Sequence, residues 1–350
     1  MDEKRVRWSH GEFSVTPVAA MLTDLVFHVD GADFRPLARA PWLDDVCEET
    51  GHPVLTRTTL RTHLDVLGGE FPCVPFGGDH GYGANAEWDL ASYGRGVRAT
   101  IEYPSDSAIA RVQRDIFPVQ GEARVEFELV VEARRAARLP LGLHPILRLP
   151  TKPRALSIAV DFEHGRTHPS MAATSHVTTH DTRFTTLSNV PAPSGSVDLA
   201  RLPLPSDDDR SIALDGVDDG GMLFGARSPL SAHYLEDGAE LVLEWDDAEL
   251  PSINYWYSDR GLSDPPWRGR YRGLGLEPAR AYFDYGMHPS VDTNPLSEAG
   301  ESTSVALAAG EKVTITSALA ARPRAAAHDA RADVRSSHEP ALQKRTSDAH

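Results

Sequence analysis

The sequence predicts an all-β protein. Residues 97–103 read Val-Arg-Ala-Thr-Ile-Glu-Tyr, and such strict alternation of apolar and polar residues is typical of a strand with one buried face. Turn signals such as Asp-Gly at 30–31 and 237–238 separate runs of this kind, and 26 prolines spread along the chain discourage long helices. Many strands joined by polar turns indicate an antiparallel sandwich or barrel.

The same alternation marks further strands along the chain. Each run sets Val, Leu, Ile, Phe, Tyr or Trp against charged or polar neighbours, and the expected strands lie at residues 97–103, 125–131, 156–162, 241–245, 253–257 and 313–315. Residues 191–221 are rich in Pro, Ser, Asp and Gly, and we expect a long excursion there because strand patterns continue on both sides. No repeat of 20 to 50 residues is evident, which disfavours propellers and solenoids.

The composition limits the classes of ligand that are expected. A net charge of −16 disfavours nucleic acid and anionic membrane surfaces, which attract basic proteins, so a neutral small molecule is the expected partner. Cys47 and Cys73 have neither CxxC nor Cys/His metal spacing, although one bridge between them stays possible. No segment resembles a transmembrane helix or a signal peptide, and we expect a cytoplasmic protein.

Two distant segments each place one ionisable side chain at the end of a short apolar run. Residues 141–145 read Leu-Gly-Leu-His-Pro, and residues 274–278 read Leu-Gly-Leu-Glu-Pro. His144 has an ordinary pKa of about 6.5, which suits proton transfer near neutral pH. We expect it at a strand end, because Pro145 blocks further pairing.

Glu277 lies in an apolar, Gly-containing strand into which a carboxylate fits poorly. Burial raises a carboxylate pKa toward the range of a general base. His144 and Glu277 together therefore predict a proton-transfer pair, while a core histidine and an ion pair of Glu277 with Arg272 or Arg280 remain the alternatives.

Other residues could complete such a site. His80 lies in the loop Gly-Gly-Asp-His-Gly-Tyr-Gly, where glycines let the backbone approach a ligand closely. Aromatic planes pack on the apolar faces of sugar rings, and polar side chains bind the hydroxyl groups. The candidates for substrate binding are His80, Asn85, Trp88, Trp256 and Asp259, with core packing as the alternative for each aromatic residue.

Metal and nucleotide sites are not expected. His176 and His180 are four residues apart, but the segment between them lacks the glutamate of HExxH and favours a strand. The sequence also contains neither GxSxG nor a phosphate-binding loop. We expect no metal and no cofactor.

At these segments the sequence resembles the aldose 1-epimerase (galactose mutarotase-like) family. The resemblance runs from about residue 15 to residue 320 and depends on the order and spacing of short motifs. These are Gly-Gly-Glu-Phe-Pro-Cys-Val-Pro-Phe-Gly at 68–77, His-Gly-Tyr-Gly-Ala-Asn-Ala-Glu-Trp at 80–88, Leu-His-Pro at 143–145, Gly-Leu-Glu-Pro at 275–278 and Leu-Ala-Ala-Gly-Glu at 307–311.

The resemblance implies a large antiparallel β-supersandwich and makes one domain over residues 1–320 preferable to two. Residues 321–350 carry few large apolar groups and predict a disordered tail, with a short Ala-rich helix as the other possibility. The implied activity is interconversion of the α and β anomers of an aldose without a cofactor. Glu277 would then be the base at the C1 hydroxyl, His144 the acid at the ring oxygen, and His80 a further ring-oxygen or hydroxyl contact.

The substrate remains open between several classes. The hexose-6-phosphate epimerases of the family carry an Arg that meets phosphate where this chain has Ala84, so an unphosphorylated aldose is expected, although Arg57, Arg61, Arg95 or Arg98 could substitute. One alternative is a sugar-binding protein that has lost turnover. Another is a glycoside hydrolase or lyase that pairs Glu277 with Asp259. A monomer and a homodimer are equally compatible with the sequence.

Overall fold

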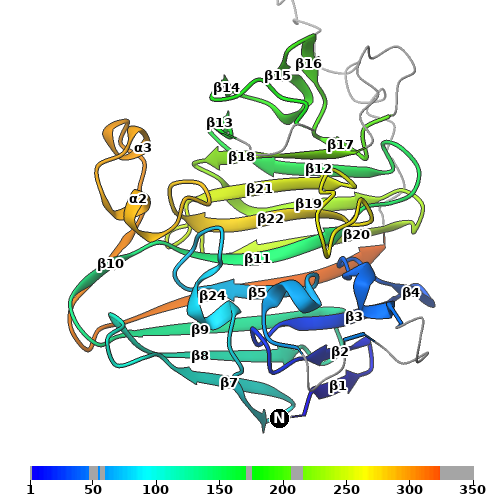
Figure 1. Ribbon diagram of the computed structural model, residues 1–350. Coiled ribbons are helices and arrows are strands. Elements are labelled where there is room, and N and C mark those ends of the chain that lie inside the picture. The colour runs from blue at the N-terminus through cyan, green and yellow to red at the C-terminus, as the bar shows by residue number, and fades with distance from the viewer. Residues whose placement is uncertain (1, 47–53, 56–59, 171–175, 206–215, 324–350) are drawn as a thin grey trace, which may run out of the picture.

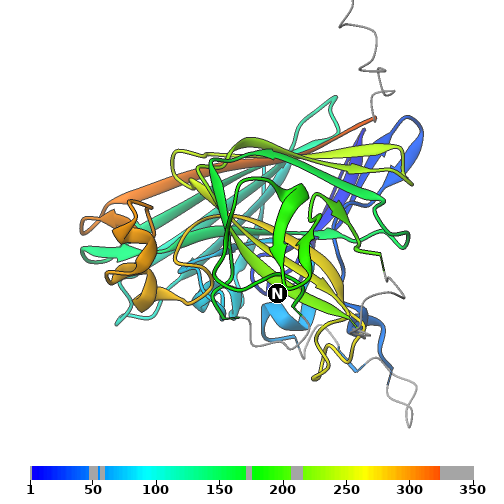
Figure 2. The ribbon, with the colours of Figure 1, turned by 90° about the horizontal axis from the view of Figure 1, so that it is seen from above.

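The computed structural model describes residues 2–46, 54–55, 60–170, 176–205 and 216–323. Two antiparallel sheets form two layers that face one another (Figures 1 and 2). Among the described residues, no helix has the length and apolar character needed to cross a bilayer.

The first sheet has eleven strands. Along the sheet they are β1 (Lys4–Trp8), β2 (Gly11–Val15), β3 (Leu22–Val29), β5 (Glu70–Cys73), β11 (Leu141–Arg148), β22 (Arg272–Arg280), β21 (Ser252–Asp259), β18 (Val217–Phe224), β13 (His164–Thr167) and β14 (Arg183–Phe184), with β4 (Ala32–Phe34) paired to β3.

The second sheet has nine strands. Their order is β17 (Arg201–Leu202), β12 (Leu156–Asp161), β19 (Arg227–Tyr234), β20 (Ala239–Trp245), β24 (Lys312–Pro323), β9 (Arg124–Ala133), β8 (Ile109–Pro118), β7 (Gly96–Glu102) and β6 (Asp89–Tyr93).

Smaller elements lie outside the two main sheets. Two further sheets have two strands each and pair β10 (Ala137–Leu139) with β23 (Val305–Leu307) and β15 (Val190–Ala192) with β16 (Gly195–Val197). The helices are short and comprise α1 (Gly81–Ala84), α2 (Met287–Val291) and α3 (Pro295–Glu298), with 3₁₀ turns η1 (Pro41–Asp44), η2 (His63–Val66) and η3 (Leu187–Asn189).

Period-two alternation assigns every strand residue to one of two faces. On β11, Leu143 and Leu147 point between the sheets and join the main core, whereas Ile146 belongs to a second cluster on the outer face. Burial of each such leucine contributes about 1.5–3 kcal/mol. The outer face of the first sheet, in front of which α1 lies in Figure 1, is therefore also packed and can support a site.

One ion pair is buried between the sheets. The Arg114 guanidinium on β8 contacts the carboxylate of Glu70 on β5, and both side chains are almost fully buried. Arg114 also donates to the carbonyl of Ala20 at 2.7 Å and lies over the ring of Phe127. Paired and hydrogen-bonded in this way, the two charges can be accommodated in an apolar layer.

The all-β prediction is confirmed, and the six expected strands correspond to β7, β9, β12, β20, β21 and β24. The boundary expected at residue 320 is too early, because β24 continues to Pro323, with Ala321 paired to Leu241 of β20. The rest of the predicted tail, residues 324–350, lies outside the described residues. The end of the expected excursion is strand as well, since β18 begins at Val217.

Candidate active site

The two predicted catalytic residues lie in one row that crosses the first sheet. Residue pairing places Phe71 of β5 beside His144 of β11, and Glu277 of β22 beside Asn254 of β21. Between β11 and β22, the pairs Gly142–Ala279 and Ile146–Gly275 flank a gap, and continuous register across it sets His144 opposite Glu277. Four neighbouring strands thus bring Phe71, His144, Glu277 and Asn254 together on the outer face.

The gap in the ladder has a chemical cause. Pro145 and Pro278 follow His144 and Glu277, and proline has no backbone N–H to donate. The expectation that β11 ends at Pro145 is wrong, because the strand runs on to Arg148 and its partner β5 pairs with Pro145 through Glu70. The prolines interrupt the pairing locally and leave both strands intact.

His144 and Glu277 contact one another. Nε2 of His144 lies 3.3 Å from Oε1 of Glu277, and each side chain is only 3% exposed. The amide of Asn254 donates to Oε2 of Glu277 at 2.8 Å, and the ring of Phe71 stacks on His144 at 4.6 Å. Both residues are thereby fixed in orientation before any ligand binds.

The alternative ion pairs of Glu277 do not form. Arg272 donates to Asp259 at 2.8 Å, and Arg280 donates to the carbonyls of Glu249 and Ala248. Glu277 therefore has an amide and an imidazole as neighbours.

Burial sets the protonation of the pair. It raises the pKa of Glu277 to about 8, with the hydrogen bond from Asn254 opposing the shift and the charge of Asp284 adding to it. Burial likewise lowers the pKa of His144 well below its ordinary value, and the neighbouring His80 and His63 add to this. At neutral pH the buried pair therefore carries one proton, held mainly by Glu277.

Gly275 makes room for this carboxylate. A Cβ at this position would meet Oε1 of Glu277 and would also contact the Trp256 side chain. The glycine two residues before Glu277 thus allows the carboxylate to lie against the sheet surface.

The His80 loop joins the pair, as the sequence predicts. His80 has a left-handed backbone, with φ of 56°, and precedes α1. Its ring lies 4.7 Å from that of His144 and 4.5 Å from that of His63. Burial lowers the pKa of His80 to about 3, so the imidazole beside the His144–Glu277 pair is neutral.

Asn85 supports this loop from within. Its amide nitrogen donates to the carbonyls of Asp79 and Gly81, and its oxygen lies 3.0 Å from Nδ1 of His63. His63 was missed by the sequence interpretation, because the segment Thr-His-Leu-Asp that contains it matches no recognisable motif. The structure gives Asn85 a positioning role, with His63 nearer to the pair.

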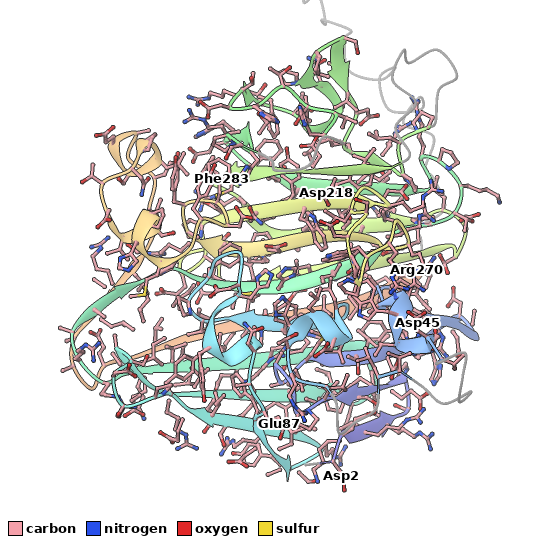
Figure 3. The ribbon with its side chains drawn as sticks, in the orientation of Figure 1. Asp2, Asp45, Glu87, Asp218, Arg270 and Phe283 are labelled. Carbon is pink, nitrogen blue, oxygen red and sulfur yellow. The ribbon has the colours of Figure 1, made fainter. Side chains whose placement is uncertain are left out.

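Trp256 lies beside the pair and belongs to an aromatic cluster. Its ring is 6.4 Å from that of His144 and stacks on Tyr271 at 5.5 Å. The indole N–H donates to Asp218 at 2.9 Å, which fixes the ring plane. The bidentate contact of Arg270 with Asp45 ties the segment bearing Tyr271 to the segment after η1 (Figure 3).

Asp218 is a second residue that the sequence interpretation missed. Burial raises its pKa to about 6, opposed by the hydrogen bond from Trp256. In the sequence, Asp218 lies in an Asp-Asp-Gly-Gly run at 218–221, at the end of the long loop excursion expected over residues 191–221, where no strand is predicted.

Two predicted binding residues have structural roles instead. Trp88 is 1% exposed, belongs to the main core and donates to the carbonyl of Gly83 at 2.8 Å, so it offers no face to a sugar. Asp259 is held by Arg272 and Arg260 at the end of β21. Along β21, Asp259 lies five residues beyond Asn254, the residue paired with Glu277.

The described residues contain no group of three or more His, Cys, Asp or Glu side chains able to hold a metal ion. The rings of His176 and His180 do lie 4.0 Å apart. Cys47 is outside the described residues, and burial raises the pKa of the free Cys73 thiol well above its ordinary value.

Comparison with solved structures identifies the fold. A protein from Escherichia coli K12, provisionally assigned as an aldose 1-epimerase, superposes with a TM-score of 0.61 at 15% identity, over 92% of this chain and 99% of that one. The chain has the galactose mutarotase-like fold. A galactose mutarotase-like protein from Lactobacillus casei matches with a TM-score of 0.56 at 12% identity, over 92% of this chain and 100% of its own.

A galactose mutarotase related enzyme from Lactobacillus acidophilus matches over 92% of this chain and 97% of its own, with a TM-score of 0.54 at 10% identity. No family model and no curated protein matches the sequence. The galactose mutarotase-like fold of the predicted family is therefore confirmed at the level of structure, and activity has to be argued from the site.

Proposed function

We propose that this protein is a cofactor-independent aldose 1-epimerase that interconverts the anomers of an unphosphorylated aldose. The observation that carries the proposal is the contact of His144 with Glu277 at 3.3 Å in a buried site. Anomerisation requires one proton to leave the C1 hydroxyl and one to reach the ring oxygen. These two oxygens are bonded to the same carbon, so a base and an acid in contact with one another can reach both.

In the proposed reaction, the one proton of the pair first passes from Glu277 to Nε2 of His144, 3.3 Å away. Glu277, now a carboxylate, takes the proton of the C1 hydroxyl while the His144 imidazolium gives its proton to the ring oxygen. The C1–O ring bond breaks, C1 becomes an aldehyde, and the proton of the pair now lies on Glu277. Rotation about the C1–C2 bond and the reverse transfers close the ring on either face. General acid and general base each contribute about 10² to 10⁴-fold.

The surroundings support a neutral substrate. Asp218 accepts from Trp256, whose ring lies 6.4 Å from that of His144, and the backbone carbonyl of Asp284 accepts from Gly78 in the His80 loop. Ala84 is fully buried and Arg98 is held by Asp115 in the second sheet. A phosphate would meet carboxylates at this site, whereas sugar hydroxyl groups can donate to them.

Exchange NMR on free aldoses tests the proposal. With D-glucose, D-galactose, D-mannose and D-xylose, the wild-type protein should speed anomer exchange of at least one sugar. The Glu277→Gln variant should lose at least about 100-fold of that rate. The matched control is Glu122→Gln, which changes an exposed glutamate.

Two results would contradict the proposal. Sugar binding without faster exchange would identify a binding protein of the same fold. Release of chromophore from aryl glycosides that depends on Glu277 would identify a hydrolase.

A further inference from the structure

A second ionisable pair, His168 with Asp284, lies at the edge of the site. Asp284 follows β22 by four residues, and His168 directly follows β13. Nε2 of His168 lies 2.9 Å from Oδ1 of Asp284. The mechanism proposed above uses neither residue.

The tautomer of His168 is fixed by its surroundings. The backbone N–H of Ser170 donates to Nδ1 at 3.2 Å, so Nδ1 is the acceptor and Nε2 carries the hydrogen. The His168 side chain is only 7% exposed, and its backbone N–H donates to the carbonyl of Gly220 on β18. His168 is therefore a rigid donor aimed at the Asp284 carboxylate.

Asp284 is anchored to the segments that form the catalytic site. Its carbonyl accepts from the N–H of Gly78, in the His80 loop, at 2.6 Å. The preceding residue Phe283 is buried, has a left-handed φ of 48°, and donates its N–H to Sδ of Met222, which pairs with Asn254. A strained, buried residue thus turns the carboxylate outward.

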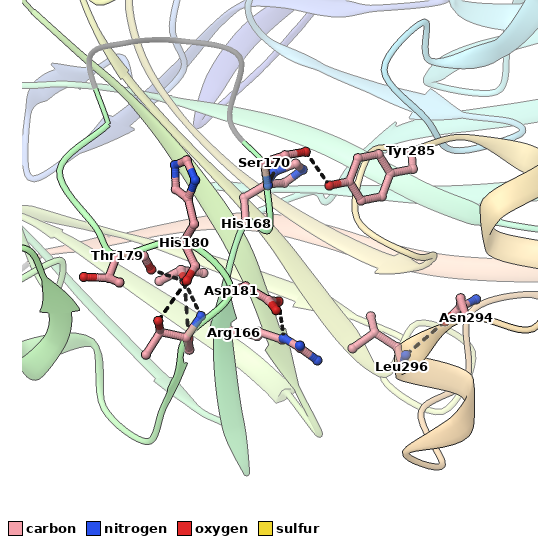
Figure 4. Close-up of polar contacts among 11 residues, drawn as sticks. Arg166, His168, Ser170, Thr179, His180, Asp181, Tyr285, Asn294 and Leu296 are labelled. Carbon is pink, nitrogen blue, oxygen red and sulfur yellow. Dashed lines mark hydrogen bonds and ion pairs between the residues drawn. The ribbon is translucent and has the colours of Figure 1, made fainter.

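A second contact holds the same two segments together. The hydroxyls of Ser170 and Tyr285 lie 2.8 Å apart, and Figure 4 shows His168 beside this contact. The segment after β13 and the segment after β22 are therefore clamped at two adjacent points, and the position of Asp284 is set by both.

The Asp284 carboxylate remains open to a ligand. Although desolvation opposes it, the hydrogen bond from His168 holds the pKa of Asp284 below its ordinary value, so the group is ionised at neutral pH. Its side chain is 51% exposed, in contrast to the buried histidine behind it. An oriented carboxylate accepts hydrogen bonds from sugar hydroxyl groups and donates none.

We propose that Asp284, positioned by His168, accepts a hydroxyl group of the aldose away from C1 and thereby decides which neutral sugars bind. The inference rests on the proposed sugar site and extends it to substrate class: a free aldose with a hydroxyl donor at this carboxylate. A site that hydrogen-bonds a hydroxyl group discriminates strongly against analogues that lack it.

Binding of deoxy sugars to full-length variants tests this without requiring turnover. Dissociation constants are measured by ligand-observed NMR for the hexose that binds the wild type best among D-glucose, D-galactose and D-mannose, and for its 2-, 3-, 4- and 6-deoxy analogues. One analogue should bind the wild type about 10- to 100-fold more weakly than the parent sugar, as expected for a hydrogen bond to a charged group. In Asp284→Asn, that difference should shrink several-fold while the penalties of the other analogues stay unchanged.

The positioning role of His168 has its own variants. His168→Phe removes the N–H donor to Asp284. This variant should bind the parent sugar more weakly and should show a smaller difference in dissociation constant between that sugar and the sensitive deoxy analogue. His168→Asn keeps an N–H donor and should restore part of both the affinity and the difference. Asp292→Asn, at an exposed position after α2, is the matched control for loss of one negative charge and should leave every dissociation constant unchanged.

The outcomes separate this inference from the proposed function. Faster anomer exchange combined with equal deoxy penalties in the wild type and Asp284→Asn overturns the role of Asp284 alone. Binding with the expected coupling but no exchange overturns the enzymatic proposal and leaves this inference standing. Absence of binding by all three hexoses overturns the inference.

Discussion

Two buried glutamates flank the strand that carries His144, and they have opposite surroundings. Glu70 on β5 and Glu277 on β22 are each 2% exposed. Glu70 points between the sheets and meets the Arg114 guanidinium, whereas Glu277 points to the outer face and meets Asn254 and His144. Equal burial therefore leads to a structural ion pair on one side of β11 and to a proton carrier on the other.

The difference lies in the partner. Burial lowers the pKa of Arg114 to about 9, so the guanidinium stays charged at neutral pH and compensates Glu70. The partners of Glu277 carry no such permanent charge, and its pKa rises to about 8. Burial alone does not keep a carboxyl group protonated near neutral pH; burial without a full counter-charge does.

The largest expected effect on stability comes from breaking the ion pair of Glu70 with Arg114. Glu70→Gln should lower the free energy of unfolding by about 3–5 kcal/mol, because it leaves Arg114 buried and uncompensated. Denaturant titration measures the loss. A double variant, Glu70→Leu with Arg114→Met, should recover most of it, since an apolar replacement of a buried pair is often neutral. A double variant as unstable as Glu70→Gln would show that the comparison is wrong.

Neutralising Glu277 should instead raise the free energy of unfolding at high pH. Glu277 has a folded-state pKa of about 8 against an ordinary value of 4.5, so its contribution to stability is complete below pH 4.5 and is lost as the pH rises through 8. Glu277→Gln should match the wild type at about pH 5 and exceed its stability by about 1–2 kcal/mol above pH 8. Thermal unfolding at several pH values measures this, and a variant less stable at every pH would contradict it.

The rate of anomer exchange should depend on the shared proton. The active form of the pair carries one proton, and this form is lost as the pH rises through about 8. In the free protein, kcat/KM should therefore be level near neutral pH and fall about tenfold per pH unit above that value. A rate that instead rises through pH 8 would show that the fully deprotonated pair is the active form.

The smallest expected effect concerns Asn254. Its amide donates to the Glu277 carboxylate and opposes the upward shift of the pKa, so Asn254→Leu should move the falling limb of the pH profile to higher pH. The measurement is the same profile on the variant. An unchanged limb would mean that the group observed in the profile is not Glu277.

The sequence predicted the β architecture, and it singled out the two residues that the structure brings into contact, because both depend on local signals. Alternation marks strands, and the matching segments that end in His-Pro and Glu-Pro marked His144 and Glu277. The register that sets these two residues opposite one another is not local, since it depends on pairing between residues 133 positions apart, and only the structure provides it.

The same limit explains the errors. Trp88 and Asp259 have side chains suited to a sugar. In the structure Trp88 donates to the carbonyl of Gly83 and Asp259 accepts from Arg272, and the alternation of apolar and polar residues cannot predict either contact. Asp218, Asp284 and His63 carried no motif, and they reach the site through distant strands and loops. Residue type predicted what chemistry was possible, and tertiary contacts decided which residues lie close enough together to take part in it.

Phe71, His144, Glu277 and Asn254 form a row across four strands, and this row determines which insertions and deletions the site can tolerate. Successive residues of a strand alternate between faces, so deletion of one residue within β22 before Glu277 would turn the carboxylate into the apolar layer and bring an apolar neighbour outward. Deletion of two residues would restore the face but shift the carboxylate along the strand by about 7 Å, beyond reach of His144. Length changes compatible with function are therefore confined to the connecting loops, where new substrate preferences can arise without disturbing the proton-transfer pair.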